Sequence, residues 1–296
     1  MSPKPTPTDS NPTVRFALPK GRMQAGVLRL LGEAGIAVSA TERSYRPSVS
    51  LANVDTKILK PQNIVEMLEL GSRDIGFAGA DWVAELEADV VELLDTQLDP
   101  VRIVAAAPVE LLENNQLPTG RPLVVASEYQ RLTTNWIATR QLDARCVRSY
   151  GATEVFPPED ADAIVDNTAT GATLRDNGLA IVDELMRSST RFYANPRALE
   201  IPEKKRVIDE LVLLLQSVLN ARKRVMVEVN VTKKDLDAVV DVLPCMRHPT
   251  IAPLHGEDGY AVKAAVPREG LPQLVIALKQ RGATDIVVSN LSQIVI

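Results

Sequence analysis

The stretch ADAIVDNTATGATLRDNGL at residues 161–179 carries the clearest indication of both fold and chemistry. An apolar run leads into Asp166, small polar residues then crowd a turn around Gly171, and a helix starts near Leu174. This pattern predicts a buried strand, a tight turn and a helix N-terminus, as in parallel α/β sheets. Backbone amides and threonine hydroxyls at such a turn suit a phosphate group, and Asp166 is placed to accept hydrogen bonds from a sugar diol. Alternatively, one of the threonines only caps the helix.

A second strand–turn–helix pattern lies at LPKGR, residues 18–22, where Lys20 and Arg22 flank Gly21. Taken alone, these two cations are equally consistent with solvated surface charges. Ligands of open α/β sheets bind outside the carboxyl ends of the strands. Two such turns on one sheet therefore favour a crevice for a phosphorylated small molecule.

Strand and helix patterns alternate from Val14 to a long amphipathic helix at 203–224, which predicts an α/β domain with mostly parallel strands. The following residues are ordered strand, helix, strand, strand, helix, strand, which is a split βαβ arrangement. We therefore expect an α/β domain at 14–224 and a smaller domain at 225–296, with the boundary near Arg224. Residues 1–13, MSPKPTPTDSNPT, read as a disordered tail.

The composition of the 296 residues excludes several functional classes. The net charge of −5 and an aromatic content of 4% argue against a surface for nucleic acid. No apolar run approaches the roughly 20 residues that span a bilayer, so no membrane partner is expected. Two cysteines, Cys146 and Cys245, are too few for a disulfide framework. We expect a cytoplasmic protein from a reducing compartment.

Two further segments hold reactive residue types. HPTIAPLHG at 248–256 contains both histidines, seven residues apart, without acidic or thiol partners at metal spacing, so we interpret it as a strand with exposed histidines. STRF at 189–192 resembles the Thr-Arg-Phe tripeptide of prephenate dehydratases, but the asparagine of that family is missing upstream. We interpret STRF as a strand edge.

From Val14 to Ile296 the chain resembles the ATP phosphoribosyltransferases of histidine biosynthesis, in their long form with a regulatory domain. The resemblance lies in LPKGRM at 18–23, DIGFAGADWV at 74–83, GATEVFP at 151–157, residues 161–179 and HPTIAPL at 248–254. It implies a two-lobed catalytic domain like type II periplasmic binding proteins and a C-terminal ferredoxin-like, ACT-like βαββαβ domain. The implied reaction transfers the phosphoribosyl group of phosphoribosyl pyrophosphate to N1 of ATP, releasing pyrophosphate.

The resemblance also assigns residue roles. Asp166 would hold the ribose hydroxyls, Glu154 would lie close to the ribose or the metal, and Lys20, Gly21 and Arg22 would neutralise substrate phosphates. The residues that would wrap the 5′-phosphate are Ala169, Thr170, Gly171, Ala172, Thr173 and Leu174. Mg²⁺ would be held mostly by substrate oxygens and water, with Glu154 the one side chain that could reach it.

For the C-terminal domain, the resemblance implies feedback inhibition by L-histidine, with Thr250 near the ligand. The implied assembly is a homo-hexamer in exchange with dimers. Asn230 stands where some long forms carry an aspartate, which leaves the strength of inhibition open.

Two positions of the first domain depart from the family pattern: Asn167 replaces an apolar residue, and Gln62 replaces a lysine. Two other functions stay open at this point. One is a non-catalytic two-lobed sensor with an amino-acid-binding module, and the other is a prephenate dehydratase-like lyase.

Overall fold

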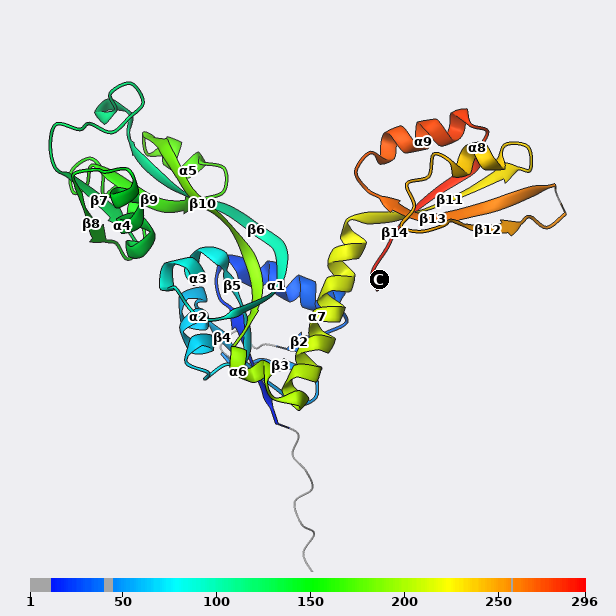
Figure 1. Cartoon of the computed structure of the whole chain (residues 1–296), viewed down its shortest axis with the longest axis horizontal. Coiled ribbons are helices and arrows are strands. Elements are labelled where there is room, and N and C mark those ends of the chain that lie inside the picture. Colours follow the sequence, from blue (N-terminus) through cyan, green and yellow to red (C-terminus); the bar gives the residue numbers. More distant parts are fainter. Residues whose placement is uncertain (1–11, 40–44, 257) are drawn as a thin grey trace, which may run out of the picture. The chain divides into compact units, whose positions relative to one another are not determined.

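The computed structural model describes residues 12–39, 45–256 and 258–296, which pack as two compact units (Figure 1). The first unit holds the described residues up to Arg29 together with Ile36–Asp209. The second holds Leu30–Gly35 and Glu210–Ile296. Helix α7 (Pro202–Arg222) thus contributes to both units, whereas the predicted boundary coincides with the start of β11 at Arg224. The limits 14–224 and 225–296 stay predictions, and the predicted tail lies almost wholly outside the described residues.

The first unit is built on an eight-stranded sheet with the order β4-β1-β5-β10-β6-β9-β7-β8. In its first lobe β1 pairs in parallel with β4 and β5, and in its second lobe β7 pairs in parallel with β8 and β9. These strands are β1 (Val14–Pro19), β4 (Val54–Leu59), β5 (Ile75–Gly79), β7 (Leu123–Ser127), β8 (Ala144–Arg148) and β9 (Ala163–Thr168). The short strands β2 (Val38–Ser39) and β3 (Ser48–Val49) form a separate pair. The expected α/β class is confirmed.

Two long strands, β6 (Val91–Pro108) and β10 (Leu179–Ala194), pair antiparallel with each other and join the lobes. β10 also pairs with β5 of the first lobe, and β6 pairs with β9 of the second. STRF therefore lies in the middle of the sheet, where Thr190 is fully buried. Its interpretation as a strand edge is wrong, because β10 has hydrogen-bonded neighbours on both sides.

The helices of the first unit cover the two lobes. In the first lobe they are α1 (Arg22–Glu33), whose residues from Leu30 on belong to the second unit, α2 (Pro61–Glu69) and α3 (Ala80–Leu86). In the second lobe they are α4 (Gln130–Thr139) and α5 (Ala172–Asp176). Two single turns, η1 (Val109–Leu111) and η2 (Thr153–Val155), lie in loops, and α6 (Pro196–Leu199) precedes α7. The core of the first lobe includes the rings of Phe16, Phe77 and Phe192, with centroids 4.6–5.8 Å apart. Such tilted contacts are favourable for aromatic rings.

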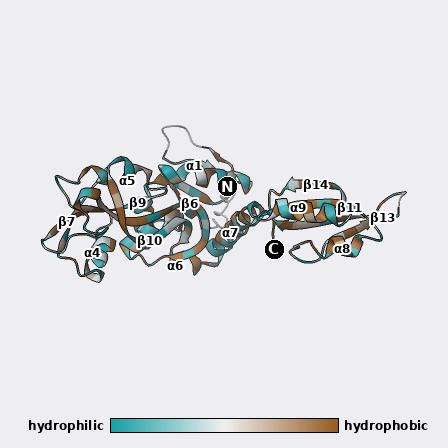
Figure 2. Cartoon of the chain, turned by 90° about the horizontal axis from the view of Figure 1, so that it is seen from above, coloured by the Kyte–Doolittle hydropathy of each residue, from teal (hydrophilic) through white to brown (hydrophobic). Residues whose placement is uncertain are grey.

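One ion cluster anchors the start of α7 within the first unit. Asp74 is 3% exposed and accepts hydrogen bonds from Arg15 at 2.9 Å and from Lys204 at 2.9 Å. These two partners lower the pKa of Asp74 against the opposing effect of its burial. Figure 2 shows hydrophilic and hydrophobic residues alternating along α7, and its buried positions include Ile208 and Leu211. The helix is amphipathic, as the sequence predicts.

The second unit has the predicted βαββαβ order. Its elements are β11 (Arg224–Thr232), α8 (Leu236–Val240), β12 (Thr250–Pro253), β13 (Gly259–Pro267), α9 (Leu271–Gln280) and β14 (Thr284–Asn290). The strand order β12-β13-β11-β14 is that of a ferredoxin-like sheet, which confirms the expected fold. Alternate residues of β11 are buried against both helices. The run DIVVSNLSQIVI at 285–296 predicts a strand to the end of the chain, but β14 ends at Asn290.

None of the helices in the described part of the chain has the length and the apolar run that crossing a bilayer requires.

Candidate functional site

The two strand–turn–helix units predicted from the sequence meet at one pocket of the first unit. The pocket has a volume of about 330 Å³. Arg22, the first residue of α1, comes from the first lobe, and Glu154 and Asp166 come from the second. The remaining lining residues belong to the turn after β9 and to α5: Asn167, Thr168, Ala169, Thr170, Ala172, Thr173 and Leu174. One cation, Arg22, and two carboxylates, Glu154 and Asp166, thus face one cavity next to a helix N-terminus.

The turn after β9 is held by its own side chains. Gly171 has φ +74°, a backbone conformation that L-residues rarely adopt, and its N–H donates to the Thr168 hydroxyl at 2.9 Å. The Arg175 guanidinium donates to the Thr170 carbonyl at 3.0 Å. Gly171 itself is buried behind the turn, whereas Thr170 and Thr173 are exposed. These contacts leave the first turn of α5 facing the pocket, where amide hydrogens lack intrahelical acceptors.

Asp166 lies near the end of β9, in an acidic environment. Burial raises the pKa of its carboxyl to about 6, and the negative charges of Glu128 and Glu154 raise it further. The hydrogen bond from the backbone N–H of Asn167, 2.6 Å long, lowers the pKa and so opposes these effects. A carboxylate in this environment gains from a ligand that donates hydrogen bonds or brings positive charge. Among the described residues, no three His, Cys, Asp or Glu side chains are arranged to hold a metal ion.

The two cations of the first turn, Lys20 and Arg22, have different surroundings. Arg22 is exposed and lines the pocket. Lys20 is not among the lining residues: its ammonium donates to the Tyr45 hydroxyl at 3.0 Å and lies 4.9 Å from the centre of the Tyr45 ring. The hydrogen bond from Lys20 lowers the pKa of Tyr45. Gly21 has φ +83°, which allows the sharp turn between β1 and α1.

A buried polar network that we did not predict lies behind the pocket. The Tyr129 hydroxyl donates to Asp81 at 2.7 Å, and the Ser188 hydroxyl donates to the other Asp81 oxygen at 2.6 Å. Tyr129 and Asp81 are 1% and 3% exposed, and Trp82 stacks on the Tyr129 ring. A side chain at Gly79 would collide with the Asp81 carboxylate, which explains the glycine in DIGFAGAD. The motif DIGFAGAD is the one sequence signal for this network. Its spacing does not reveal that Asp81 pairs with Tyr129, which lies 48 residues further along the chain.

The two lobes are also clamped through α3 and α4. The Glu85 carboxylate accepts from the backbone N–H groups of Arg131 and Leu132, both at 2.9 Å. It thereby caps the N-terminus of α4 from another helix, a favourable position for a negative charge. The Arg131 guanidinium also donates to the Ala84 carbonyl at 2.7 Å. These contacts join α3 of the first lobe to α4 of the second.

The candidate regulatory residues lie on one face of the second sheet. Ala261 of β13 pairs with Asn230 of β11 on one side and with Ala252 of β12 on the other. Thr250 lies two residues before Ala252 in β12. Alternate residues of a strand point to the same side, so Thr250 and Asn230 share a face. The Asn230 amide donates to Asp285 at 3.0 Å. His248 and His255 flank β12 and are exposed.

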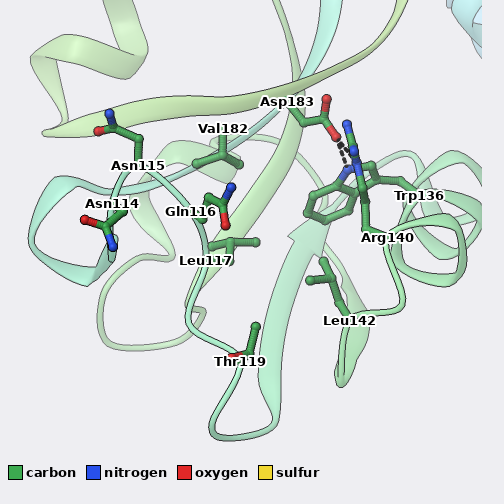
Figure 3. Close-up of a pocket in the computed structure, with 10 residues that line it drawn as sticks. All are labelled: Asn114, Asn115, Gln116, Leu117, Thr119, Trp136, Arg140, Leu142, Val182 and Asp183. Atoms are coloured by element: carbon green, nitrogen blue, oxygen red, sulfur yellow. Dashed lines mark hydrogen bonds and ion pairs between the residues drawn. The ribbon is translucent and has the colours of Figure 1, made fainter.

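A larger pocket, of about 510 Å³, lies elsewhere in the second lobe (Figure 3). Asn114, Asn115 and Trp136 are among its lining residues. Its one carboxylate, on Asp183, accepts from the Trp136 indole at 2.8 Å and from Arg140 at 2.6 Å, and these bonds lower its pKa, with Arg140 the larger cause. The two charged groups of this pocket, Arg140 and Asp183, are thus paired with each other.

Comparisons with known proteins give one consistent result. Residues 60–217 match the family model HisG, described as ATP phosphoribosyltransferase, and residues 221–293 match the model of the HisG C-terminal domain. The ATP phosphoribosyltransferase of Chlorobium luteolum is 34% identical over 296 residues, which cover 97% of this chain and 99% of that protein. The enzyme of the same name from Pelotomaculum thermopropionicum is 34% identical over 288 residues, covering 95% and 99%.

A solved structure shows the same architecture for the first unit. It is described as an ATP phosphoribosyl transferase (HisG:HisZ) complex from Thermotoga maritima. The matched chain is 25% identical, with a TM-score of 0.60, and the match covers 69% of this chain and 99% of that one.

Proposed function

Because the chain belongs to the ATP phosphoribosyltransferase family, in the long form with a C-terminal domain, we propose that it transfers the phosphoribosyl group of phosphoribosyl pyrophosphate to N1 of ATP. The family catalyses the first step of histidine biosynthesis. The observation that carries the proposal is the single pocket that combines Arg22 with Asp166 and the turn after β9. The products are N1-(5-phosphoribosyl)-ATP and pyrophosphate.

The turn after β9 binds the 5′-phosphate in this proposal. The first-turn amides of α5 and the exposed hydroxyls of Thr170 and Thr173 converge on the pocket, where they match the three oxygens of a phosphate monoester. Ala169, Gly171, Ala172 and Leu174 shape the turn. Asp166 accepts hydrogen bonds from the ribose hydroxyls, and Glu154 lies beside the ribose.

The chemical step forms a bond between adenine N1 and the ribose C1 and breaks the bond from C1 to the pyrophosphate oxygen. Adenine N1 is already a nucleophile, so no strong general base is required. Glycosyl transfer passes through a transition state with positive charge on the sugar. The carboxylates of Asp166, Glu128 and Glu154 stabilise that charge, and Arg22 stabilises the leaving pyrophosphate. Catalysis then comes from positioning and electrostatics.

Lys20 and Gly21 belong to the same proposal at the first turn. For Lys20 to neutralise a substrate phosphate, its ammonium must exchange the Tyr45 hydroxyl for a phosphate oxygen. An anion is the stronger acceptor, so the exchange is favourable when substrate is bound.

Mg²⁺ accompanies the pyrophosphate in the proposed complex. The pocket supplies carboxylate oxygens, which suit a hard cation, but no cluster of protein ligands. Mg²⁺ would therefore be held mostly by substrate oxygens and water, with Glu154 the one side chain of this pocket that could reach it, and when bound it would neutralise charge on the leaving group.

The second unit is the proposed site of feedback inhibition by L-histidine. Thr250 and Asn230 on one sheet face support a small polar ligand there. Asn230 is a neutral amide, so it contributes no charge attraction to the histidine ammonium. The proposal also includes a homo-hexamer in exchange with dimers and a cytoplasmic location.

The test is one assay: the protein with ATP, phosphoribosyl pyrophosphate and Mg²⁺, following the N1-substituted adenine by ultraviolet absorbance, with and without histidine. Product that falls with histidine supports the reaction and the regulation together. Product that histidine does not change keeps the reaction and contradicts the regulatory role. A folded protein that binds phosphoribosyl pyrophosphate without product contradicts the reaction and favours a sensor, and turnover of prephenate would favour a lyase.

A truncated chain ending at Arg224 separates the two roles. It should lose any histidine response, and its folding and oligomeric state are checked first. Unchanged inhibition in the folded truncated chain would contradict the assignment of the second unit.

A further inference from the structure

Asn167 makes two hydrogen bonds that connect the pocket to the buried network behind it. Its side-chain amide donates to the Asp166 carboxylate at 3.0 Å and to the Tyr129 hydroxyl at 3.3 Å. We propose that Asn167 is a positioning residue, which fixes the orientation of the Asp166 carboxylate toward the ribose by anchoring it to Tyr129 and Asp81. The inference rests on the proposed function, because it takes Asp166 as the residue that binds the ribose hydroxyls.

The chemistry of the neighbours determines which end of the amide faces them. Burial, followed by the charge of Asp81, raises the pKa of Tyr129, so its hydroxyl keeps its proton and donates it to Asp81. The Tyr129 oxygen is therefore left as an acceptor toward Asn167. Asp166 is also an acceptor when ionised. Only the amide nitrogen, with two hydrogens, satisfies both neighbours at once.

The far end of this chain of bonds is rigid. Asp81 is held by Tyr129, by Ser188 and by a bond from its own backbone N–H to the Ser188 hydroxyl at 3.1 Å. Asp81 belongs to α3 of the first lobe, and Ser188 to the central strand β10. Asn167 itself is exposed, so packing does not fix its side chain, and the two hydrogen bonds are what orient it.

The electrostatics of the pocket explain why Asp166 needs such an anchor. Glu128 and Glu154 repel its carboxylate. The Asp166 carboxylate accepts hydrogen bonds from the backbone N–H and the side-chain amide of Asn167 and from the Thr153 hydroxyl. The backbone N–H and the side-chain amide of Asn167 donate to the same carboxylate oxygen, Oδ1. Anchoring Oδ1 through a side chain that is itself bonded to Tyr129 fixes the orientation in which the carboxylate meets the ribose hydroxyls.

The experiment compares two probes by titration calorimetry on the full chain: ribose 5-phosphate and inorganic phosphate. Ribose 5-phosphate needs both the turn and Asp166, whereas inorganic phosphate needs only the turn. Asn167→Leu, of similar size, removes the two side-chain bonds, to Asp166 and to Tyr129, and keeps the backbone N–H bond to Asp166. Asp166→Ala removes the carboxylate that binds the ribose. Asn135→Leu is the matched control, because it makes the same asparagine-to-leucine change at an exposed position of α4.

We expect Asn167→Leu to weaken ribose 5-phosphate binding about tenfold, the effect of losing one hydrogen bond to a charged group. Inorganic phosphate binding should stay within about twofold, and Asn135→Leu should change neither. Tyr129→Phe should weaken ribose 5-phosphate binding less than Asn167→Leu does. In the double variant it should weaken binding no further, because Asn167→Leu already removes the hydrogen bond to Tyr129.

Three results would overturn the inference in distinguishable ways. If Asn167→Leu leaves ribose 5-phosphate binding unchanged while Asp166→Ala weakens it, the positioning role fails and the proposed function stands. Equal weakening of both probes by Asn167→Leu would mean that the turn itself has moved, and the residue is merely structural. If Asp166→Ala has no effect on ribose 5-phosphate, the ribose role of Asp166 fails and the inference fails with it.

Discussion

Asp166→Asn should make the ligand-free protein more stable while impairing its activity. An ordinary aspartate titrates near 3.9, whereas burial in the pocket raises the pKa of Asp166 to about 6, against the opposing N–H of Asn167 and with added repulsion from Glu128 and Glu154. The ionised carboxylate is thus disfavoured in the folded state. Asparagine keeps the acceptor oxygen for the Asn167 N–H and has no charge for Glu128 or Glu154 to repel.

The pH dependence of this effect has a definite sign. Between about pH 4 and pH 6 the folded state binds more protons at Asp166 than the unfolded state, so this residue's contribution to the free energy of unfolding falls as the pH rises. A shift of about two pKa units corresponds to about 3 kcal/mol, and partial exposure to water reduces this to roughly 2 kcal/mol. The destabilisation is complete above about pH 6 and absent below about pH 4.

The measurement is thermal unfolding of the wild type and of Asp166→Asn between pH 4 and pH 8, without substrates. At pH 8 the variant should melt roughly 4–8 °C higher, a difference that shrinks toward zero near pH 4. In the assay for N1-(5-phosphoribosyl)-ATP the variant should lose at least about tenfold in kcat/KM, because the amide accepts less strongly from the ribose diol. Wild-type kcat/KM should itself decline below about pH 6 as Asp166 is protonated. A variant that melts at or below the wild-type temperature at pH 8 would refute the electrostatic reasoning, and one with full activity would remove Asp166 from the site.

Three further outcomes follow from the contacts of the first unit. Asp74→Ala leaves Lys204 buried without its carboxylate and should lower the free energy of unfolding in urea by about 3–5 kcal/mol; a loss below about 1 kcal/mol would show that the cluster contributes little. Glu85→Ala removes the cap of α4 and should cost about 1–2 kcal/mol in the same measurement, whereas Glu87→Ala, the exposed control, should cost less than about 0.5 kcal/mol. Arg22→Ala should raise KM for phosphoribosyl pyrophosphate roughly tenfold without lowering stability, since its side chain is exposed, and an unchanged KM would place the pyrophosphate elsewhere.

Local sequence patterns were sufficient for much of the fold. The strand, turn and helix at 161–179 need only an apolar run, a glycine that tolerates positive φ and a helix start, all of which lie within a few residues of each other. The βαββαβ order of the second unit follows from the same kind of local periodicity. Local patterns do not explain the full length of β6 and β10. Pro100 and the left-handed residues Gln97 and Asp99 interrupt the first of these strands, and the second contains the helix-favouring run DELMR. Both persist as strands because pairing with each other and with the two lobes outweighs local propensity.

The sequence by itself determined the chemical groups of the candidate site, since a strand that ends near Asp166 and a glycine turn before a helix are local features. Only the tertiary structure decided which groups meet. It brings Arg22 into the pocket, turns Lys20 toward Tyr45, and places Tyr129 between Asn167 and Asp81. The hydrogen-bonded pairs among these residues are separated by 25 to 48 residues in the sequence. They can form only after the sheet has aligned the segments that carry them. The physical reason is that periodicity and propensity act within a few residues, whereas the pairing of buried polar groups depends on the packing of the whole unit.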